Sequence, residues 1–126
     1  MKRIWLSLLL LAAILGGTLA HSRQLGALTD TLCGQLRQAA QAADRGHWPQ
    51  AAALTDAAWQ QWERRGFYLH AMLRHDSLDE IRTGFARARA YLDHQAPWEL
   101  SAALAELVHQ LELLQEAEQL TLQNVL

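Results

Sequence analysis

The sequence contains little of the material from which catalytic and metal sites are usually built. Of its 126 residues only one is a cysteine, Cys33, so no internal disulfide and no zinc-type cysteine spacing can form. Lys2 is the only lysine, and the chain has neither a Gly-rich phosphate loop nor a G-x-S-x-G motif. Because no nucleophile stands in a recognised setting, we expect that the protein is not an enzyme and uses no cofactor.

Basic charge is also scarce beyond the N-terminus. After Lys2 and Arg3, the chain carries nine basic and 13 acidic residues. No stripe of basic side chains is present that could neutralise a phosphate backbone, so the composition argues against a nucleic-acid partner. No segment alternates apolar and polar residues as a strand does, and we therefore expect an all-α protein.

One long stretch, Ile4 to Ala20, carries no charge at all and directly follows two basic residues. A helix of these 17 residues rises about 25 Å, near the lower limit for crossing the hydrocarbon core of a bilayer. We predict an uncleaved membrane anchor that contacts the lipid bilayer through residues 4–20. The residues assigned to the span are Ile4, Trp5, Leu8, Leu11, Ile14 and Leu19.

A cleaved signal peptide is the alternative interpretation, because Thr18-Leu19-Ala20 resembles a small-residue cleavage site. The apolar run is long for a signal peptide, and apolar periodicity resumes soon after it at Leu25, so the anchor is preferred. In both cases the N-terminus stays in the cytoplasm and the rest of the chain crosses the membrane. We therefore divide the chain into an anchor segment, 1–22, and an extracytoplasmic helical domain, 23–126.

Apolar residues in steps of three and four predict four helices in that domain. The first covers about 25–43 and ends before Gly46, which suits a left-handed cap. The second starts near Pro49 and runs to about 73, since proline is favourable in the first helical turn.

The third expected helix starts at Ser77, which would form a capping box with Glu80. The fourth starts at Pro97, and the apolar tail after it is expected to pack on the bundle. The segments "ADRGHWPQAAAL" and "LDHQAPWELSAAL" lie about 49 residues apart and resemble each other. This repeated pattern predicts two helical hairpins, and hence a bundle of about four helices.

Several short motifs follow one another in a characteristic order. "MKRIW" precedes the apolar run, and later motifs include Trp48, Ala51, Trp62, His75, Asp79, Glu80, Ile81, Leu122, Asn124 and Val125. In this order the chain resembles, over nearly its whole length, the bacterial family called domain of unknown function 4363. It departs from that family in being rich in Arg, Ala and Gln instead of Lys and Glu. The resemblance implies a helical protein anchored in the bacterial cytoplasmic membrane, and it implies no activity.

Three tryptophans are the main candidates for binding a partner. Trp48 lies at the start of the second expected helix, and Trp59 and Trp62 lie three residues apart further along it. Tryptophans mostly fill cores and helix seams, but they are also enriched where proteins bind one another. These three and His75 are therefore the candidate contacts with a protein partner, such as another membrane protein.

The stretch "RHDSLDE" has the most site-like composition in the chain. On a continuous helix His75 and Asp79 would be four residues apart, a spacing that can bind a metal ion. The expected break at Ser77 disturbs this geometry, so the pair is only a weak candidate and we predict no metal. His75 would instead satisfy the last carbonyls of the second helix.

Two further features have simple structural interpretations. Cys33 is expected to be buried or half-buried in the first helix. Arg64 and Arg65 are interpreted as a solvated face, because two arginines alone are too few to argue contact with anionic lipid headgroups. The sequence as a whole predicts a structural or protein-interaction role outside the membrane. The alternative is an anchored or secreted module that binds a ligand or metal ion, as a sensor or chaperone would.

Overall fold

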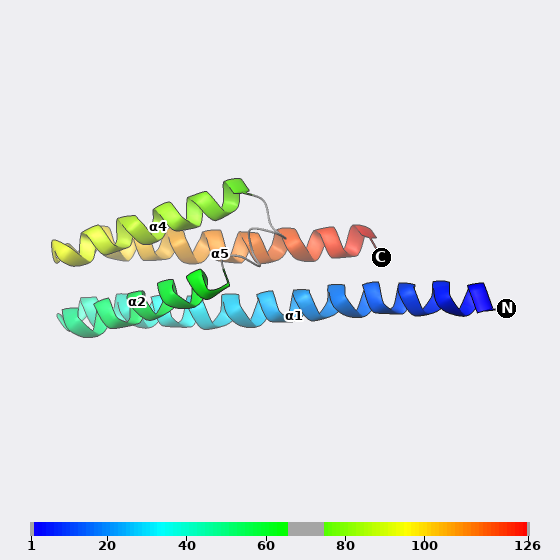
Figure 1. Ribbon diagram of the computed structural model, residues 1–126. Coiled ribbons are helices and arrows are strands. Elements are labelled where there is room, and N and C mark those ends of the chain that lie inside the picture. Colours follow the sequence, from blue (N-terminus) through cyan, green and yellow to red (C-terminus); the bar gives the residue numbers. More distant parts are fainter. Residues whose placement is uncertain (1, 66–74, 126) are drawn as a thin grey trace.

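The computed structural model describes residues 2–65 and 75–125, and in this part of the chain all regular structure is helical. The prediction of an all-α fold is therefore confirmed. The helices, labelled as in Figure 1, are α1 (Lys2–Asp44), α2 (Trp48–Arg64), α4 (His75–Asp93) and α5 (Pro97–Val125).

The helices pack as an antiparallel bundle in which neighbours along the chain lie side by side. α1 packs against α2 and α5, and α4 packs closely against α5 but only sparsely against α2. The α1–α2 and α4–α5 turns lie at the same end of the bundle, far from the N-terminus (Figure 1). The two pairs are the helical hairpins that the repeated sequence pattern predicts. Between the hairpins, α2 contacts α4 less than α1 contacts α5.

The two turns have the same hydrogen-bonded geometry. At the end of α1, the His47 N–H donates to the Ala42 carbonyl at 2.8 Å, and Gly46 has a φ of 76°. At the end of α4, the Ala96 N–H donates to the Tyr91 carbonyl at 3.0 Å, and the residue before Ala96 is again left-handed. Both are Schellman caps, in which a left-handed residue lets the last carbonyls of a helix find donors. This shared geometry explains why the two sequence segments resemble each other.

The core is formed by the apolar stripes of the helices. Its large and fully buried side chains are Phe85, Leu32, Leu36, Ile81, Leu100, Leu104, Leu107 and Leu111. α4 and α5 approach closely at Gly84, where an added Cβ would lie 2.9 Å from the Cδ1 atom of Leu107. A larger residue at position 84 would therefore require the end of the Leu107 side chain to shift.

Two predicted boundaries are wrong. α2 ends at Arg64, well before residue 73, and Gly66, Leu69 and Leu73 lie outside the described residues. α4 begins at His75, so Ser77 is inside the helix and is not its cap. The predicted cap at Ser77 was wrong because serine and acidic residues are also acceptable in the first turn of a helix, where negative charge complements the dipole.

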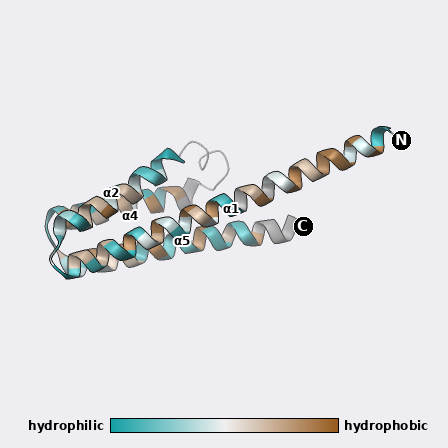
Figure 2. Cartoon of the chain, turned by 90° about the horizontal axis from the view of Figure 1, so that it is seen from below, coloured by the Kyte–Doolittle hydropathy of each residue, from teal (hydrophilic) through white to brown (hydrophobic). Residues whose placement is uncertain are grey.

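The N-terminal part of α1 extends beyond the other helices (Figures 1 and 2). It is one continuous helix with the part of α1 that belongs to the bundle, so the boundary expected at residue 22 falls within a helix. Among the described residues, no helix is both long enough and apolar enough for a bilayer crossing. That finding does not support the span predicted at residues 4–20.

Candidate interaction groove between α2 and α4

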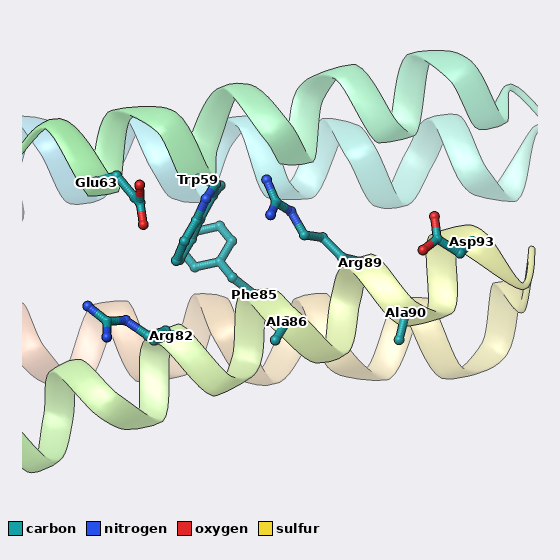
Figure 3. Close-up of a pocket in the computed structure, with 8 residues that line it drawn as sticks. All are labelled: Trp59, Glu63, Arg82, Phe85, Ala86, Arg89, Ala90 and Asp93. Carbon is teal, nitrogen blue, oxygen red and sulfur yellow. The ribbon is translucent and has the colours of Figure 1, made fainter.

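A groove of about 590 Å³ runs along the side of the bundle where α2 and α4 face each other (Figure 3). It lies on a sparsely packed side of the bundle, since α2 and α4 contact each other less than α1 contacts α2 or α4 contacts α5. The groove is lined by Trp59, Glu63, Arg82, Phe85, Ala86, Arg89, Ala90 and Asp93.

An aromatic pair forms the floor of the groove. The rings of Trp59 and Phe85 meet edge to face, with their centroids 5.2 Å apart and an interplanar angle of 60°. Phe85 is fully buried because it belongs to the apolar stripe of α4, whereas Trp59 is half-buried. Such a pair contributes about 0.5–1.5 kcal/mol beyond the burial of its area. It also joins α2 to α4 where other contacts are few.

Arg89 adds a cation to this floor. Its guanidinium carbon lies 5.2 Å from the Trp59 ring centroid, and its Nη2 atom donates to the Asp56 carboxylate at 3.2 Å. Its Nε atom is buried and has no hydrogen-bond partner within the described part of the chain. The adjacent π face of the Trp59 ring offsets part of the free-energy cost of leaving this buried donor unpaired. Because both charged side chains of the ion pair are about half exposed, the pair contributes little to stability.

Charges of both signs surround the aromatic floor. Glu63 of α2 and Arg82 of α4 lie at one end of the groove, and Asp93 lies at the other (Figure 3). Between these charges, α4 also presents the small and exposed side chains of Ala86 and Ala90 beside the aromatic floor. An apolar centre with a charged rim is the usual composition of a protein-binding surface.

The three candidate tryptophans occupy different environments. Trp62 is 5% exposed and belongs to the core, while Trp48 is half-buried against the core near the α1–α2 turn. Only Trp59 lines the groove. The spacing of Trp59 and Trp62 in the sequence did not show which of them lines the groove. That depends on which side of α2 faces α4, and this is set by the packing of the helices. The exposed aromatic that the sequence did not single out is Trp98, at the start of α5.

The metal candidate remains without structural support. No group of three or more His, Cys, Asp or Glu residues is arranged to hold a metal ion within residues 2–65 and 75–125. α4 runs unbroken from His75 through Asp79, so the expected helix break between them is wrong. His75 is also not at the end of α2, and its side chain, like His70, lies outside the description. Asp79 is exposed.

Cys33 is buried, as predicted, with 3% of its surface exposed. Burial raises the pKa of the Cys33 thiol, and the nearby Glu112 carboxylate raises it further. The Arg37 guanidinium opposes this shift and the Asp30 carboxylate adds to it. A thiol with a raised pKa forms less thiolate at neutral pH, so Cys33 is a core residue and not a reactive group.

Arg82 and Arg89 were not identified from the sequence as groove residues. They are seven residues apart on α4, with Phe85 between them, and this spacing places all three on one side of a helix. That spacing was a usable signal for a mixed aromatic and cationic face. The opposing residues of α2 were not predictable, since they depend on how the two hairpins pack.

Comparisons with known proteins identify a family but no function. A family model with the description "Domain of unknown function (DUF4363)" matches residues 19–125. No curated protein and no solved structure matches the chain.

Proposed function

The chain belongs to the DUF4363 family, and we propose that this member is a helical bundle tethered to a membrane, where it binds a protein partner. The tether is the N-terminal part of α1, and the partner site is the groove between α2 and α4. The observation that carries the proposal is a helix whose large apolar side chains are exposed on all sides. These side chains are Ile4, Trp5, Leu6, Leu8, Leu9, Leu10, Leu11, Ile14 and Leu19, each between 48% and 73% exposed.

Such a surface differs from that of an ordinary bundle helix. A helix on the surface of a globular protein has one apolar stripe that faces the core, with polar residues opposite. Between Ile4 and Ala20 the only hydroxyl side chains are Ser7 and Thr18, and Ser7 donates its hydroxyl to the Arg3 carbonyl at 3.0 Å. A helix that is apolar all round requires an apolar environment, and a bilayer provides one.

The length and the flanking charges suggest how the helix would insert. The apolar run rises about 25 Å, so it is a short span, and Lys2 and Arg3 can extend their side chains to the headgroups. These basic residues favour a cytoplasmic N-terminus. We therefore place the bundle outside the cytoplasmic membrane of a bacterium.

The continuity of α1 supports a role at the membrane. α1 runs from Lys2 to Asp44 as one helix, so no flexible linker separates the anchor from the bundle. The groove between α2 and α4 would then be held at a set height beside the bilayer. A partner that is itself a membrane protein would meet the groove without losing much rotational freedom.

Alkaline carbonate extraction of membranes that contain the full chain tests the tether. We expect the protein to stay in the membrane pellet, and Leu10→Arg to weaken insertion by about 3 kcal/mol, roughly a hundredfold, because it places a charge mid-span. Leu113→Arg is the matched control, since Leu113 is 48% exposed but lies on α5. Release of the wild-type protein by carbonate, or a mature N-terminus near His21, would contradict the tether.

Photocrosslinking from the groove tests the partner site. A crosslinking amino acid at Ala90, which is exposed in the groove, should give a discrete adduct with one membrane protein in native membranes. Ala86→Arg should reduce this adduct more than about tenfold, because a large charged side chain in the centre of an interface removes its packing. Ala102, exposed on α5, is the control position. Equal adducts from Ala90 and Ala102 would exclude the groove as the site.

A small-molecule site is the second candidate function, and the groove volume favours it. About 590 Å³ lies within the range typical of ligand pockets, which also combine aromatic walls with a few polar groups. A ligand that binds there should raise the melting temperature of the purified chain, and Ala86→Arg should remove that effect. Such a result without any crosslinked protein would favour the ligand-binding function over the partner-binding one.

A further inference from the structure

A second groove, of about 390 Å³, lies between α1 and the last turn of α2. Its α1 wall begins at Gln24, four residues after the apolar run, so it lies at the end of the bundle from which the N-terminal part of α1 extends. The groove is lined by Gln24, Ala27, Leu28, Thr31, Gln61, Arg64 and Arg65.

The charges in this groove have one sign. Within residues 2–65 and 75–125, Arg64 and Arg65 are its only charged lining residues, and both are exposed. The acidic neighbour Glu63 lines the α2–α4 groove instead, on another side of α2. Arg23, which precedes the first lining residue, is exposed as well and adds a third positive charge at this end. Gln24 and Gln61 supply amide donors between the cations.

These arginines differ from those in the body of the bundle. Three body arginines each contact an acidic side chain, in the pairs Arg37–Glu112 at 2.8 Å, Arg87–Glu106 at 3.1 Å and Arg89–Asp56 at 3.2 Å. Arg64 and Arg65 form no such pair with any residue that the structure describes. Two adjacent cations that no acidic side chain of the described residues pairs with, beside a polar groove, are suited to an anionic group.

The height of the groove along α1 indicates which anion it meets. Gln24 is four residues beyond Ala20, a rise of about 6 Å along the helix. The headgroup layer on each side of a bilayer is about 5–8 Å thick. If residues 4–20 cross the hydrocarbon core, the mouth of the groove lies at the level of the lipid phosphates.

We propose that this groove binds the phosphate of an anionic phospholipid, such as phosphatidylglycerol, in the leaflet next to the bundle. The planar guanidinium groups of Arg64 and Arg65 donate to the phosphate oxygens, and arginine is well suited to such paired contacts. The inference rests on the proposed membrane tether. Lipid binding here fixes the rotation of α1 about its axis, and therefore the direction in which the α2–α4 groove faces.

The test uses the full chain in micelles of a neutral detergent, titrated with phosphatidylglycerol and followed by native mass spectrometry. We expect one saturable site, and we expect Arg64→Gln with Arg65→Gln to weaken it by roughly thirtyfold. Each surface arginine contributes about 1 kcal/mol toward an anionic membrane, which is roughly a fivefold effect. Arg45→Gln is the matched control, because Arg45 is exposed at the opposite end of the bundle and should leave the affinity unchanged.

Two comparison ligands identify the source of the phosphate. Phosphatidylcholine should bind much more weakly than phosphatidylglycerol, because its headgroup carries no net negative charge. Inorganic phosphate should neither bind at comparable concentrations nor displace the lipid. Equal binding of both lipids, or efficient displacement by inorganic phosphate, would overturn the assignment to an anionic lipid.

The remaining outcomes separate this inference from the tether. If both arginine substitutions leave the lipid affinity unchanged while carbonate still fails to extract the protein, the lipid site is wrong and the tether stands. If carbonate extracts the protein, the tether is wrong even where lipid binding depends on Arg64 and Arg65. Arg64→Lys with Arg65→Lys should retain part of the affinity, and unaltered melting in lipid-free micelles shows that both double variants fold.

Discussion

Replacing Trp62 by alanine is expected to lower the free energy of unfolding by about 3–5 kcal/mol. Trp62 is 5% exposed and lies in the same buried cluster as Ala58 and the leucines of α1 and α5. Removal of the indole leaves a cavity that its neighbours cannot fill without moving whole helices. Urea denaturation followed by circular dichroism measures this change, which is a large fraction of the 5–15 kcal/mol typical of a folded domain.

Trp98→Ala is the matched control for this substitution. Trp98 is 85% exposed at the start of α5, so its loss should change the free energy of unfolding by less than about 0.5 kcal/mol. If Trp62→Ala unfolds at the same urea concentration as the wild type but loses a partner, then Trp62 is a binding residue and its assignment to the core is wrong.

The sequence predicted the parts of the fold that depend on local interactions. Gly46 and Pro49 indicated the turn between α1 and α2, and the structure has a left-handed Gly46 followed by a helix with proline in its first turn. Pro97 likewise starts α5. These features were predictable because the conformation of a cap depends on a few neighbouring residues and not on the rest of the fold.

The second turn was harder to recognise from the sequence. Gln95 has a φ of 48°, a left-handed conformation that is unfavourable by roughly 1–2 kcal/mol for a residue with a side chain. A glycine at this position would have indicated the turn directly. The similarity between the two sequence segments indicated it instead, because an Asp, a Trp and a Pro lie near each turn.

The candidate site was less predictable because it depends on packing between hairpins. Phe85 belongs to the apolar stripe of α4, but the sequence does not show that this stripe also meets Trp59. The start of α4 was misplaced because Ser77 and Glu80 match a capping pattern by chance. Short patterns of this kind occur often inside helices, so only the packed structure tells a cap from an ordinary first turn.

The two grooves lie on different sides of α2. Glu63 and Trp59 face α4 on one side, while Arg64 and Arg65 lie beside α1 on the other. Neighbouring residues of α2 can face different grooves because each residue is rotated by about 100° around the helix axis relative to the one before it. In the proposed function, the side facing α4 would bind a partner, and in the proposed lipid site the side next to α1 would contact headgroups. A lipid that fixes the rotation of α1 would direct the partner groove along the membrane.

Phe85→Ala is expected to lower the free energy of unfolding by about 3–5 kcal/mol and to loosen α4 from α2. Phe85 is fully buried, so its removal leaves a cavity, and it also forms the edge-to-face contact with Trp59. Phe85→Leu is the control that keeps most of the volume, and it should be unfavourable by less than about 1.5 kcal/mol because the core stays filled.

A double-mutant cycle with Trp59→Ala separates the two effects of Phe85. The coupling between Trp59 and Phe85 should be about 0.5–1.5 kcal/mol, because the ring pair is lost only once when both substitutions are combined. A cycle between Phe85 and Trp98, which is exposed on α5, should give no coupling. If Trp59 and Phe85 also show none, α2 and α4 do not meet through these rings in solution, and the groove between them has no aromatic floor on which a partner could dock.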